Sequence, residues 1–359
     1  MTDVVYLMGA GASFGKRRNQ KLSSIIDILD ERNNVFAVEV PYANIIEGMP
    51  VVTEIPGRIL YICYIIRNSD SSLDLTNISN KPTSLLEDTK KVLLRDLRWL
   101  YDGAIKHATI DTFAKKLFLT GKTEEYNKLK KLLAIYFIIE QIINKPDSRY
   151  DTFLANILTP NLEIPERMKI LTWNYDSQFE IAFNEYKSQI NTPRDIGCYS
   201  LHDNDLTIQP SIFKINGTAS FKDWGSLANV KNNSNKLSKE VVDKIIKAYK
   251  DDISLLSFAW ENTGLKNSNT AVRTFIQNIQ FAKTLVVIGY TFPFFNRLVD
   301  KEIIGSLNNL KKVYIQDPRA DEVAQSIDAV LASSQKPPIN PLSIIPITNC
   351  NQFYLPAEL

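Results

Sequence analysis

The sequence is poor in the residues that build metal sites and disulfide frameworks. Its 359 residues contain three cysteines, Cys63, Cys198 and Cys350, and two histidines, His107 and His202. The cysteines lie far apart, and no Cys-x-x-Cys pair occurs. A four-cysteine zinc module is therefore excluded, and we expect neither a disulfide framework nor a histidine-rich metal site.

Long apolar runs and an excess of one charge are also missing. No segment reaches the roughly 18 uninterrupted apolar residues of a membrane span. Lys and Arg number 42 against 40 Asp and Glu, so the net charge gives no signal for nucleic acid. The first residues resemble a strand with Asp3 before it rather than a signal peptide. We therefore expect a cytoplasmic protein without a membrane partner.

Short apolar runs that end on small, polar or acidic residues recur along the chain. They are VVYLM (4–8), MKILTWNYD (168–176), SIFKING (211–217), KTLVVIGY (283–290) and KKVYIQD (311–317). Continuous apolar runs are typical of parallel strands that are covered on both faces. Helix-like segments separate most of the runs, which predicts an α/β fold with a mostly parallel sheet.

A long helical block interrupts this alternation from about residue 84 to 144. We expect it to form a large helical insertion, at about 60–150, that caps one edge of the sheet. Within it, KLKKLLAIYFIIEQIINK (128–145) is apolar nearly all round. Such a helix is buried in a core or in an oligomer interface, and the sequence leaves both open.

The remaining segments complete the expected organisation. We expect a polar helix from about residue 20 to 32 and a loop-rich segment at 33–58, where three prolines break regular structure. The main domain is predicted to span residues 1–330. Residues 331–359 are expected to form a C-terminal tail that packs on the core.

The turn after the first apolar run, GAGAS (9–13), favours a nucleotide. Gly9 and Gly11 lack a Cβ, so the backbone can approach a diphosphate closely. Ser13 and the amides after it can donate hydrogen bonds where a helix begins. However, the third glycine of the dinucleotide fingerprint is absent, because Gly15 comes one residue late. Alone, the turn fits a nucleotide site or a tight turn without a ligand.

Polar residues follow three other predicted strands. Asn174 and Asp176 end one of them, and residues two apart on a strand share a face. GYTFP (289–293) and IQDP (315–318) end two more. The carboxyl ends of parallel strands meet at one edge of the sheet, where such folds bind their ligands. The sequence therefore predicts a crevice at this edge.

The ordered set GAGAS, TWNYD, KINGTASF, VVIGYTFPFFN and VYIQDP resembles the sirtuin superfamily. With ATIDTFAKKL (108–117), it is most similar to the bacterial sirtuin-like proteins of anti-phage defence. The resemblance implies a Rossmann-type core from residue 4 to about 320 with NAD in an inverted crevice. In the defence branch it implies hydrolysis of NAD to nicotinamide and ADP-ribose, which depletes the infected cell.

The resemblance also implies roles for individual residues. Asn174 would orient the attacking water or ribose hydroxyl, Asp176 would lie near the nicotinamide ribose, and Asn216 would complete the catalytic set. The residues implied to bind the cofactor are Gly9, Ala10, Gly11, Ala12, Ser13, Gly289, Tyr290, Thr291 and Asp317. Arg17 or Arg18 could add a phosphate contact, although a solvated loop explains them as well.

Two departures from the family pattern matter. The zinc module of the deacetylating sirtuins is missing, so we do not expect a protein deacetylase. The family's catalytic histidine is replaced by Asn216, because KLHGS reads KINGT here. An amide cannot accept a proton, and losing a general base costs a factor of roughly 10²–10⁴. His107 and His202 are candidate replacements, although each also fits a structural role.

Structural explanations compete with these roles. Asp176 could cap the next helix, and Asn174 could simply form a turn. For Asp111 we expect an N-cap role, with Thr112 in the first helical turn.

The sequence thus predicts a sirtuin-like NAD+ glycohydrolase without a metal, acting as the effector of a prokaryotic antiviral system. Such an effector needs a homo-oligomer or a sensor protein encoded nearby to control it. The alternative is a catalytically silent NAD or ADP-ribose sensor, or a scaffold subunit of a defence complex.

Overall fold

The computed structural model describes most of the chain, with gaps. The main described ranges are 2–13, 85–143, 147–187, 197–200, 210–222, 224, 237–262, 270–332 and 342–359. Between residues 25 and 66 it describes 25–29, 35–39, 43–46, 49–52, 58–59, 62–63 and 65–66. Arg17, Arg18 and His202 lie outside the described residues.

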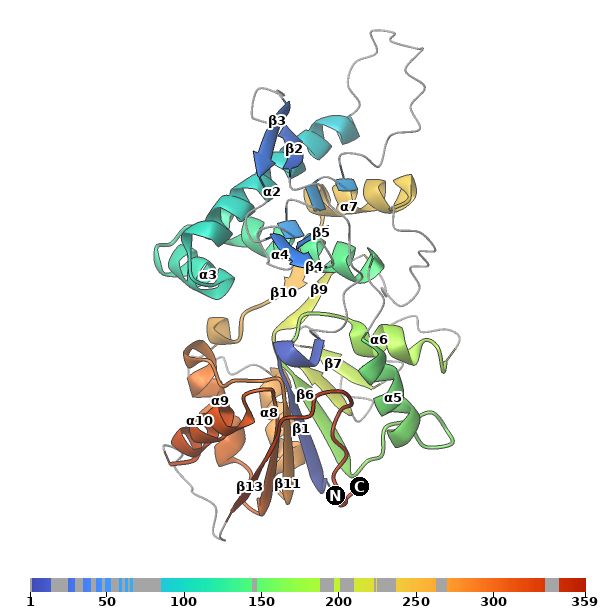
Figure 1. Ribbon diagram of the computed structural model, residues 1–359, viewed down its shortest axis with the longest axis vertical. Helices are drawn as coiled ribbons and strands as arrows, with labels where there is room; N and C mark the ends of the chain where they lie inside the picture. The colour runs from blue at the N-terminus through green and yellow to red at the C-terminus, as the bar shows by residue number, and fades with distance from the viewer. Residues whose placement is uncertain are drawn as a thin grey trace.

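A seven-stranded sheet forms the centre of the lower body in Figure 1, and every neighbouring pair of its strands is parallel. In sheet order the strands are β13 (Ser343–Ile347), β12 (Lys312–Gln316), β11 (Thr284–Ile288), β1 (Val4–Met8), β6 (Met168–Thr172), β8 (Ile212–Lys214) and β7 (Cys198–Ser200). The predicted α/β fold with a Rossmann-type parallel sheet is confirmed. Of these strands, β7 and β13 were not predicted.

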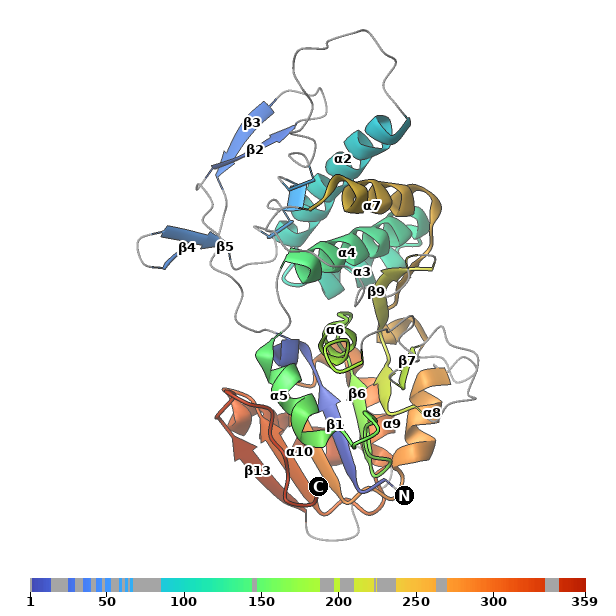
Figure 2. The ribbon, with the colours of Figure 1, turned by 90° about the vertical axis from the view of Figure 1, so that its right-hand side faces the viewer.

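Helices cover both faces of the sheet, which explains why β1 is apolar at every position (Figure 2). The helices are α5 (Ser148–Ile157), α6 (Gln178–Phe183), α8 (Thr270–Ile279), α9 (Arg297–Gly305) and α10 (Ala320–Ala332). Successive strand residues face opposite sides. Val5 and Leu7 therefore pack with α8, α9 and α10, whereas Tyr6 and Met8 pack with α5 and α6.

The C-terminal residues pack on the face that α5 and α6 cover. After the edge strand β13, the chain returns across the sheet, and the ring of Phe353 packs edge-on against Tyr150 and Phe153, with centroids 5.0 and 5.8 Å apart. The Tyr6 hydroxyl donates to the Tyr354 carbonyl at 3.0 Å. The last residues thus belong to the same core as the first strand.

A second, helical body lies above the carboxyl ends of the strands (Figure 1). It contains α2 (Leu85–Lys106), α3 (Ile110–Leu119), α4 (Thr123–Ile143), α7 (Lys239–Asp251) and the antiparallel strands β9 (Gly217–Phe221) and β10 (Ser254–Leu256). The expected helical block is confirmed, and the second half of α4, from Leu132 to Glu140, is buried nearly all round, as a core helix is. The later segment that carries β9, α7 and β10 joins the same apolar cluster, and the sequence did not predict this.

Three local predictions are wrong. The segment expected to form a polar helix holds strand β2 (Ile25–Leu29), which pairs with β3 (Val35–Glu39); β4 (Ala43–Ile46) and β5 (Met49–Val52) pair in the segment expected to be loop-rich. The β-branched residues of these short runs favour strands. The N-cap of α3 is Thr109, whose hydroxyl accepts from the Thr112 amide at 3.1 Å, so Asp111 lies in the first turn instead.

The described residues include the short 3-10 helices η1 (Ala10–Ser13), η4 (Ala259–Asn262) and η5 (Phe294–Asn296). None of the helices in the described ranges is both long and apolar enough to cross a membrane.

Candidate functional site

The order of strands in the sheet changes direction beside β1. The next sheet strand along the chain, β6, lies on one side of β1, whereas β11 and the strands after it extend on the other side. In parallel α/β sheets the ligand crevice forms at such a switch point, outside the carboxyl ends of the strands. The turns that follow β1 and β11, which carry the predicted glycines, leave the sheet at this point.

These two turns pack directly on each other. A Cβ on Gly9 would lie 2.6 Å from the Gly289 carbonyl oxygen, and one on Gly11 would lie 2.8 Å from the Gly289 Cα. Gly289 has φ +57°, and its own Cβ would lie 2.5 Å from the Ala12 nitrogen. All three glycines are therefore required by contact between the turns, whether or not a ligand is bound.

The amides of the first turn are already bonded within the protein. Gly9 donates to the Ile288 carbonyl and Gly11 to the Gly289 carbonyl, both at 3.0 Å, while Ala12 donates to the Gly9 carbonyl at 2.9 Å. Ala10 and Gly11 are exposed on the outside of the turn, whereas Ala12 is buried. A phosphate here would therefore depend on side chains and the remaining amides more than on Gly9 and Gly11.

Ser13, at the end of η1, is the meeting point of the predicted polar residues. Asn174 Nδ2 donates to Ser13 Oγ at 2.8 Å and to the Gly9 carbonyl at 2.9 Å. The hydroxyl of Tyr150 lies 2.8 Å from Ser13 Oγ. Strand β6 ends at Thr172, so Asn174 and Asp176 lie in the following loop rather than on one strand face. Asn174 nevertheless reaches this hydroxyl, and Asp176 lies close enough for Ser13 to lower its pKa.

Asp176 is partly exposed and is bonded on two sides. Burial of its carboxyl group raises the pKa of Asp176, while the charge of Lys214 and a hydrogen bond from Ser13 lower it. Its Oδ1 also accepts from the Gln178 amide at 3.1 Å, at the start of α6. Asp176 thus bonds to the first turn of α6, which agrees with the structural explanation, whereas its role in catalysis stays a prediction.

A buried ion pair lies directly behind Asp176. Lys214, at the end of β8, donates to Glu180 Oε1 at 2.9 Å and to the Asp176 carbonyl oxygen. Burial lowers the pKa of Lys214, but Glu180, Cys198 and Asp176 outweigh it, so the pKa is raised and the ammonium stays charged. The ammonium of Lys214 therefore lies behind Asp176, and Glu180 offsets part of its effect on the carboxylate.

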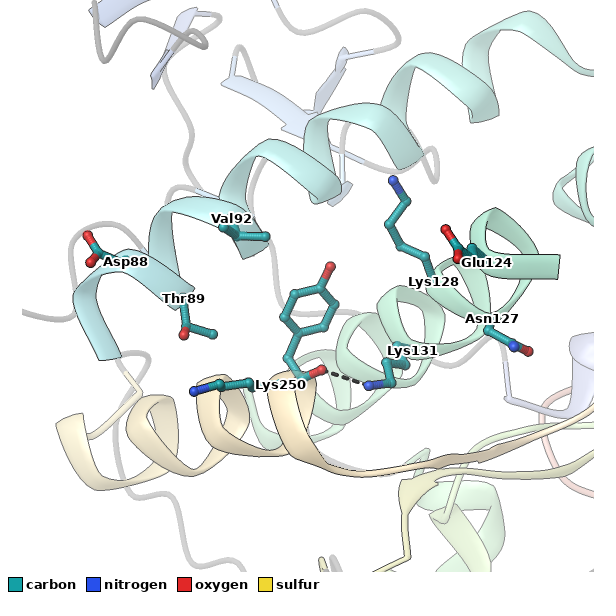
Figure 3. A pocket seen from close by; sticks show the side chains of 9 residues that line it. Asp88, Thr89, Val92, Glu124, Asn127, Lys128, Lys131 and Lys250 are labelled. Carbon is teal, nitrogen blue, oxygen red and sulfur yellow. Dashed lines mark hydrogen bonds between the residues drawn. The ribbon is translucent and has the colours of Figure 1, made fainter. Parts of the chain in front are cut away.

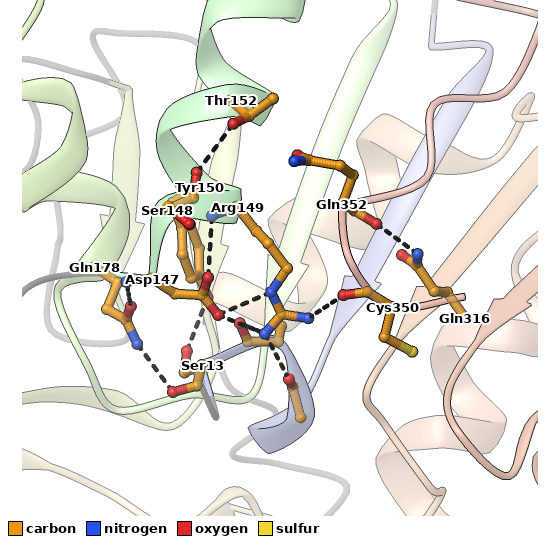
Figure 4. Close-up of polar contacts among 12 residues, drawn as sticks. Ser13, Asp147, Ser148, Arg149, Tyr150, Thr152, Gln178, Gln316, Cys350 and Gln352 are labelled. Atoms are coloured by element: carbon orange, nitrogen blue, oxygen red, sulfur yellow. Dashed lines mark hydrogen bonds and ion pairs between the residues drawn. The ribbon is translucent and has the colours of Figure 1, made fainter. Parts of the chain in front are cut away.

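Arg149 joins three separate segments around the first turn (Figure 4). Its guanidinium donates to the carbonyls of Gly11, Ala12 and Cys350 at 3.2 Å each, and it is paired with Asp147. Beside it, Gln178 Nε2 donates to the Ser13 carbonyl at 3.2 Å. These contacts connect η1, α5, α6 and the C-terminal residues.

Sequence reasoning missed several residues of this site: Arg149, Tyr150, Gln178, Glu180 and Lys214. Gln178 and Glu180 follow TWNYD closely, and Lys214 lies in KING, so their proximity to the quoted motifs was an available signal. Arg149 and Tyr150 have no such signal, because α5 meets η1 only through the tertiary fold.

The other predicted site residues lie around this centre. Thr291 is exposed at the turn after β11. Asp317 is buried, and its Oδ1 accepts from the Arg319 amide at 2.9 Å ahead of α10. Asn216 is buried, and its Nδ2 donates to the Trp173 carbonyl at 2.8 Å. In the described part of the protein its Oδ1 has no hydrogen-bond partner.

Tyr290 belongs to a buried network below the second turn. Its ring stacks on Trp173, with centroids 5.2 Å apart, and its hydroxyl donates to Asp300 Oδ1 at 2.8 Å. Burial raises the pKa of Asp300 to about 8, although the hydrogen bond from Tyr290 and the charge of Arg297 lower it. Phe292, in the same turn, is held at φ +53°, a conformation rare for a bulky residue.

Metal ligands do not gather at this site or elsewhere in the described ranges. No group of three His, Cys, Asp or Glu side chains suited to a metal ion occurs there. Cys63, Cys198 and Cys350 form no disulfide. His107 lies in the helical body, with Nδ1 2.8 Å from the Gly103 carbonyl oxygen and its ring stacked on Phe113.

The contact between the turns predicts the stability of two glycine variants. Gly289→Ala should lower the free energy of unfolding by about 2–5 kcal/mol, because the new Cβ adds steric overlap to an unfavourable φ. Gly121→Ala is the matched control, since Gly121 has φ +68° and a Cβ added there would have no described atom within 4 Å. It should cost only about 1 kcal/mol. Denaturant unfolding measures the free energy of unfolding of both variants. Equal losses of stability would contradict the close contact between the two turns.

Asp300 predicts a dependence of stability on pH. From about pH 4 to 8 the unfolded carboxyl group is ionised while the folded one keeps its proton, so the free energy of unfolding should fall as pH rises. Asp300→Asn keeps an acceptor for Tyr290 and removes the charge. Its unfolding curve should depend less on pH in this range, and the variant should be more stable than the original at pH 8. If the stability of the variant changed with pH as steeply as that of the original protein, Asp300 would be excluded as the source of the pH dependence.

Comparison with known proteins gives no family assignment. No protein-family model matches the sequence, and no curated protein matches it. The function is therefore inferred from the geometry of the site and from the motifs that it contains.

Proposed function

We propose that this protein is a sirtuin-like NAD+ glycohydrolase. The observation that carries the proposal is the hydrogen bond from Asn174 to the Ser13 hydroxyl, with Asp176 beside it, at the switch point of a parallel sheet. A carboxylate and a hydroxyl thus lie next to a glycine-containing turn, at the edge where an α/β fold binds a nucleotide.

The proposed reaction breaks the glycosidic bond between nicotinamide and C1′ of its ribose. Nicotinamide leaves as a neutral molecule with the bonding electron pair, so no acid has to protonate it. Water adds to C1′, which gives ADP-ribose, and one proton is released. The barrier is the positive charge that develops on the ribose, and a fixed carboxylate stabilises such a charge in a site that excludes water.

Asp176 is the residue that we assign to this task. It must be ionised to stabilise a cation; burial raises the pKa of the carboxyl group above its usual value, and Lys214 opposes this rise. Asn174 has both amide hydrogens committed, to Ser13 and to Gly9. We therefore assign it to positioning Ser13, while its Oδ1 is left to accept from a water or a ribose hydroxyl.

The residues present fit a nucleotide with ribose hydroxyls. Gly11 and Thr291 are exposed on the two contacting turns, and Gly11 has no side chain that would obstruct the ligand. The Asn216 Oδ1 is a buried acceptor without a donor in the described part of the protein, and a ribose hydroxyl is a donor of the required kind. Reaching it requires some local opening, since the atom is covered.

The biological role proposed for this activity is antiviral defence by depletion of NAD. It rests on the resemblance of the motifs to the sirtuin-like proteins of anti-phage systems. Unchecked hydrolysis would kill the host, so a second copy of the chain or a separate sensor protein must control the enzyme.

A silent sensor of NAD or ADP-ribose is the second candidate. Asn216 favours it, because an amide cannot accept a proton where the family has its catalytic histidine. The fully bonded amide hydrogens of Asn174 favour it as well.

Substitution of Asp176 tests the assignment. Asp176→Asn can still accept from the Gln178 amide but carries no charge. We expect it to lower NAD turnover by about 10²–10³-fold and to leave ADP-ribose binding detectable. Asp3→Asn, at the opposite end of β1, is the matched control. NAD and nicotinamide are followed with the purified full chain, alone and with the protein encoded beside it.

The same measurements separate the alternatives. Binding of NAD without turnover under every condition would favour the sensor. Failure of NAD and of ADP-ribose to raise the midpoint of thermal unfolding would favour a scaffold, since a ligand that binds only the folded state stabilises it.

The charge behind Asp176 predicts a shift in the pH profile. Lys214→Met combined with Glu180→Gln removes the buried pair without leaving an unpaired charge. The pKa of Asp176 should rise, because the lowering effect of Lys214 exceeds the raising effect of Glu180. The rise of turnover with pH should therefore move to higher pH. Glu180→Gln alone should move it the other way, and identical profiles would contradict the role of Lys214.

A further inference from the structure

A groove of about 580 Å³ lies in the helical body, between α2, α4 and α7 (Figure 3). Its volume is within the range of pockets that hold small organic ligands. The residues that line it are Asp88, Thr89, Val92, Glu124, Asn127, Lys128, Lys131, Tyr249 and Lys250. None of them belongs to the site at the strand ends.

Two of the three lysines of the groove lack a carboxylate partner. Lys131 donates to the Tyr249 carbonyl at 2.9 Å, and neither it nor Lys250 forms an ion pair within the described ranges. Burial lowers the pKa of Lys131, with Asp252 and Asp251 opposing this effect from a distance. Lys128, in contrast, lies 3.5 Å from Asp96 and over the Trp99 ring. Lys131 and Lys250 are therefore the two cations of the groove that an anionic group could reach without displacing a paired carboxylate.

An apolar wall accompanies this charge. Val92 is exposed on α2 and lines the groove. Tyr249, on α7, lines it as well, and its hydroxyl donates to Asp96. This bond fixes the largely buried ring, whose accessible part lies beside the lysines.

Acidic residues lie at the two ends of the groove. In Figure 3 Asp88 lies at one end and Glu124 at the other, with Lys131 between them. Carboxylates repel a ligand that is anionic throughout but accept hydrogen bonds from hydroxyl or amino groups. The lining therefore matches a molecule that combines one anionic group with a flat, hydroxyl-bearing body.

We propose that this groove binds a nucleoside monophosphate. The phosphate would pair with Lys131 and Lys250, and the base would lie against Val92 and Tyr249. Asp88, Glu124 or Asn127 would take up hydrogen bonds from the ribose or the base. The groove is thus a second ligand site, independent of the crevice at the strand ends and of the NAD reaction proposed for it.

Calorimetric titration of the purified full chain with adenosine monophosphate tests this site. We expect saturable binding, no detectable binding of adenosine, and weaker binding of inorganic phosphate. Lys131→Met and Lys250→Met should each weaken the affinity by about tenfold, because each removes a charge-assisted hydrogen bond. Lys131→Arg should retain binding. Lys247→Met, on an exposed position of α7 outside the groove, should have no effect.

The outcomes distinguish this site from the strand-end crevice. Adenosine monophosphate that binds equally well to the double variant of Lys131 and Lys250 would overturn the proposal. Binding that Asp176→Asn abolishes would also overturn it, since the nucleotide would then occupy the other site. Circular dichroism of each variant shows that a lost affinity is not a loss of folding. NAD turnover is not needed for any of these readouts.

Discussion

The contact between two glycine turns holds the candidate site together. Gly9 and Gly11 follow β1, Gly289 follows β11, and none of the three has room for a Cβ. Because the turns touch at the point where strand order changes, they fix Ser13 next to the loop that carries Asn174 and Asp176. Every other contact of the site builds on this geometry, including the Arg149 bonds to the Gly11 and Ala12 carbonyls.

The sequence predicted the fold better than the details of the site. Continuous apolar runs identified β1, β6, β11 and β12, because parallel strands covered on both faces leave that pattern. Strand β7 is only three residues long and β13 contains Pro346, so neither produced a clear signal. The motifs correctly brought Ser13, Asn174 and Asp176 to one edge. The reason why these positions require glycine was not predictable, since the atoms that leave no room for a Cβ belong to a turn distant in the sequence.

The buried ion pair behind Asp176 is another feature that could not be predicted from the sequence. Lys214 ended an apolar strand and was not singled out, yet its ammonium lies between Glu180 and the Asp176 carbonyl. A charge inside a protein is stable only with partners, and those partners come from α6 and the loop before it. The ionisation of Asp176 thus depends on a residue of another strand, which a linear motif does not reveal.

The helical body is assembled from two separate parts of the chain, and this limits how the protein can be dissected. Deleting residues 60–150 would leave the apolar side of α7 and the strand β9 facing solvent, because their packing partners come from α2 and α4. A fragment that contains only α2 to α4 would likewise expose to solvent the apolar surface that α7 and β9 cover. Neither half is a self-sufficient folding unit, so truncation is a poor route to separate functions, and point substitutions are the better one.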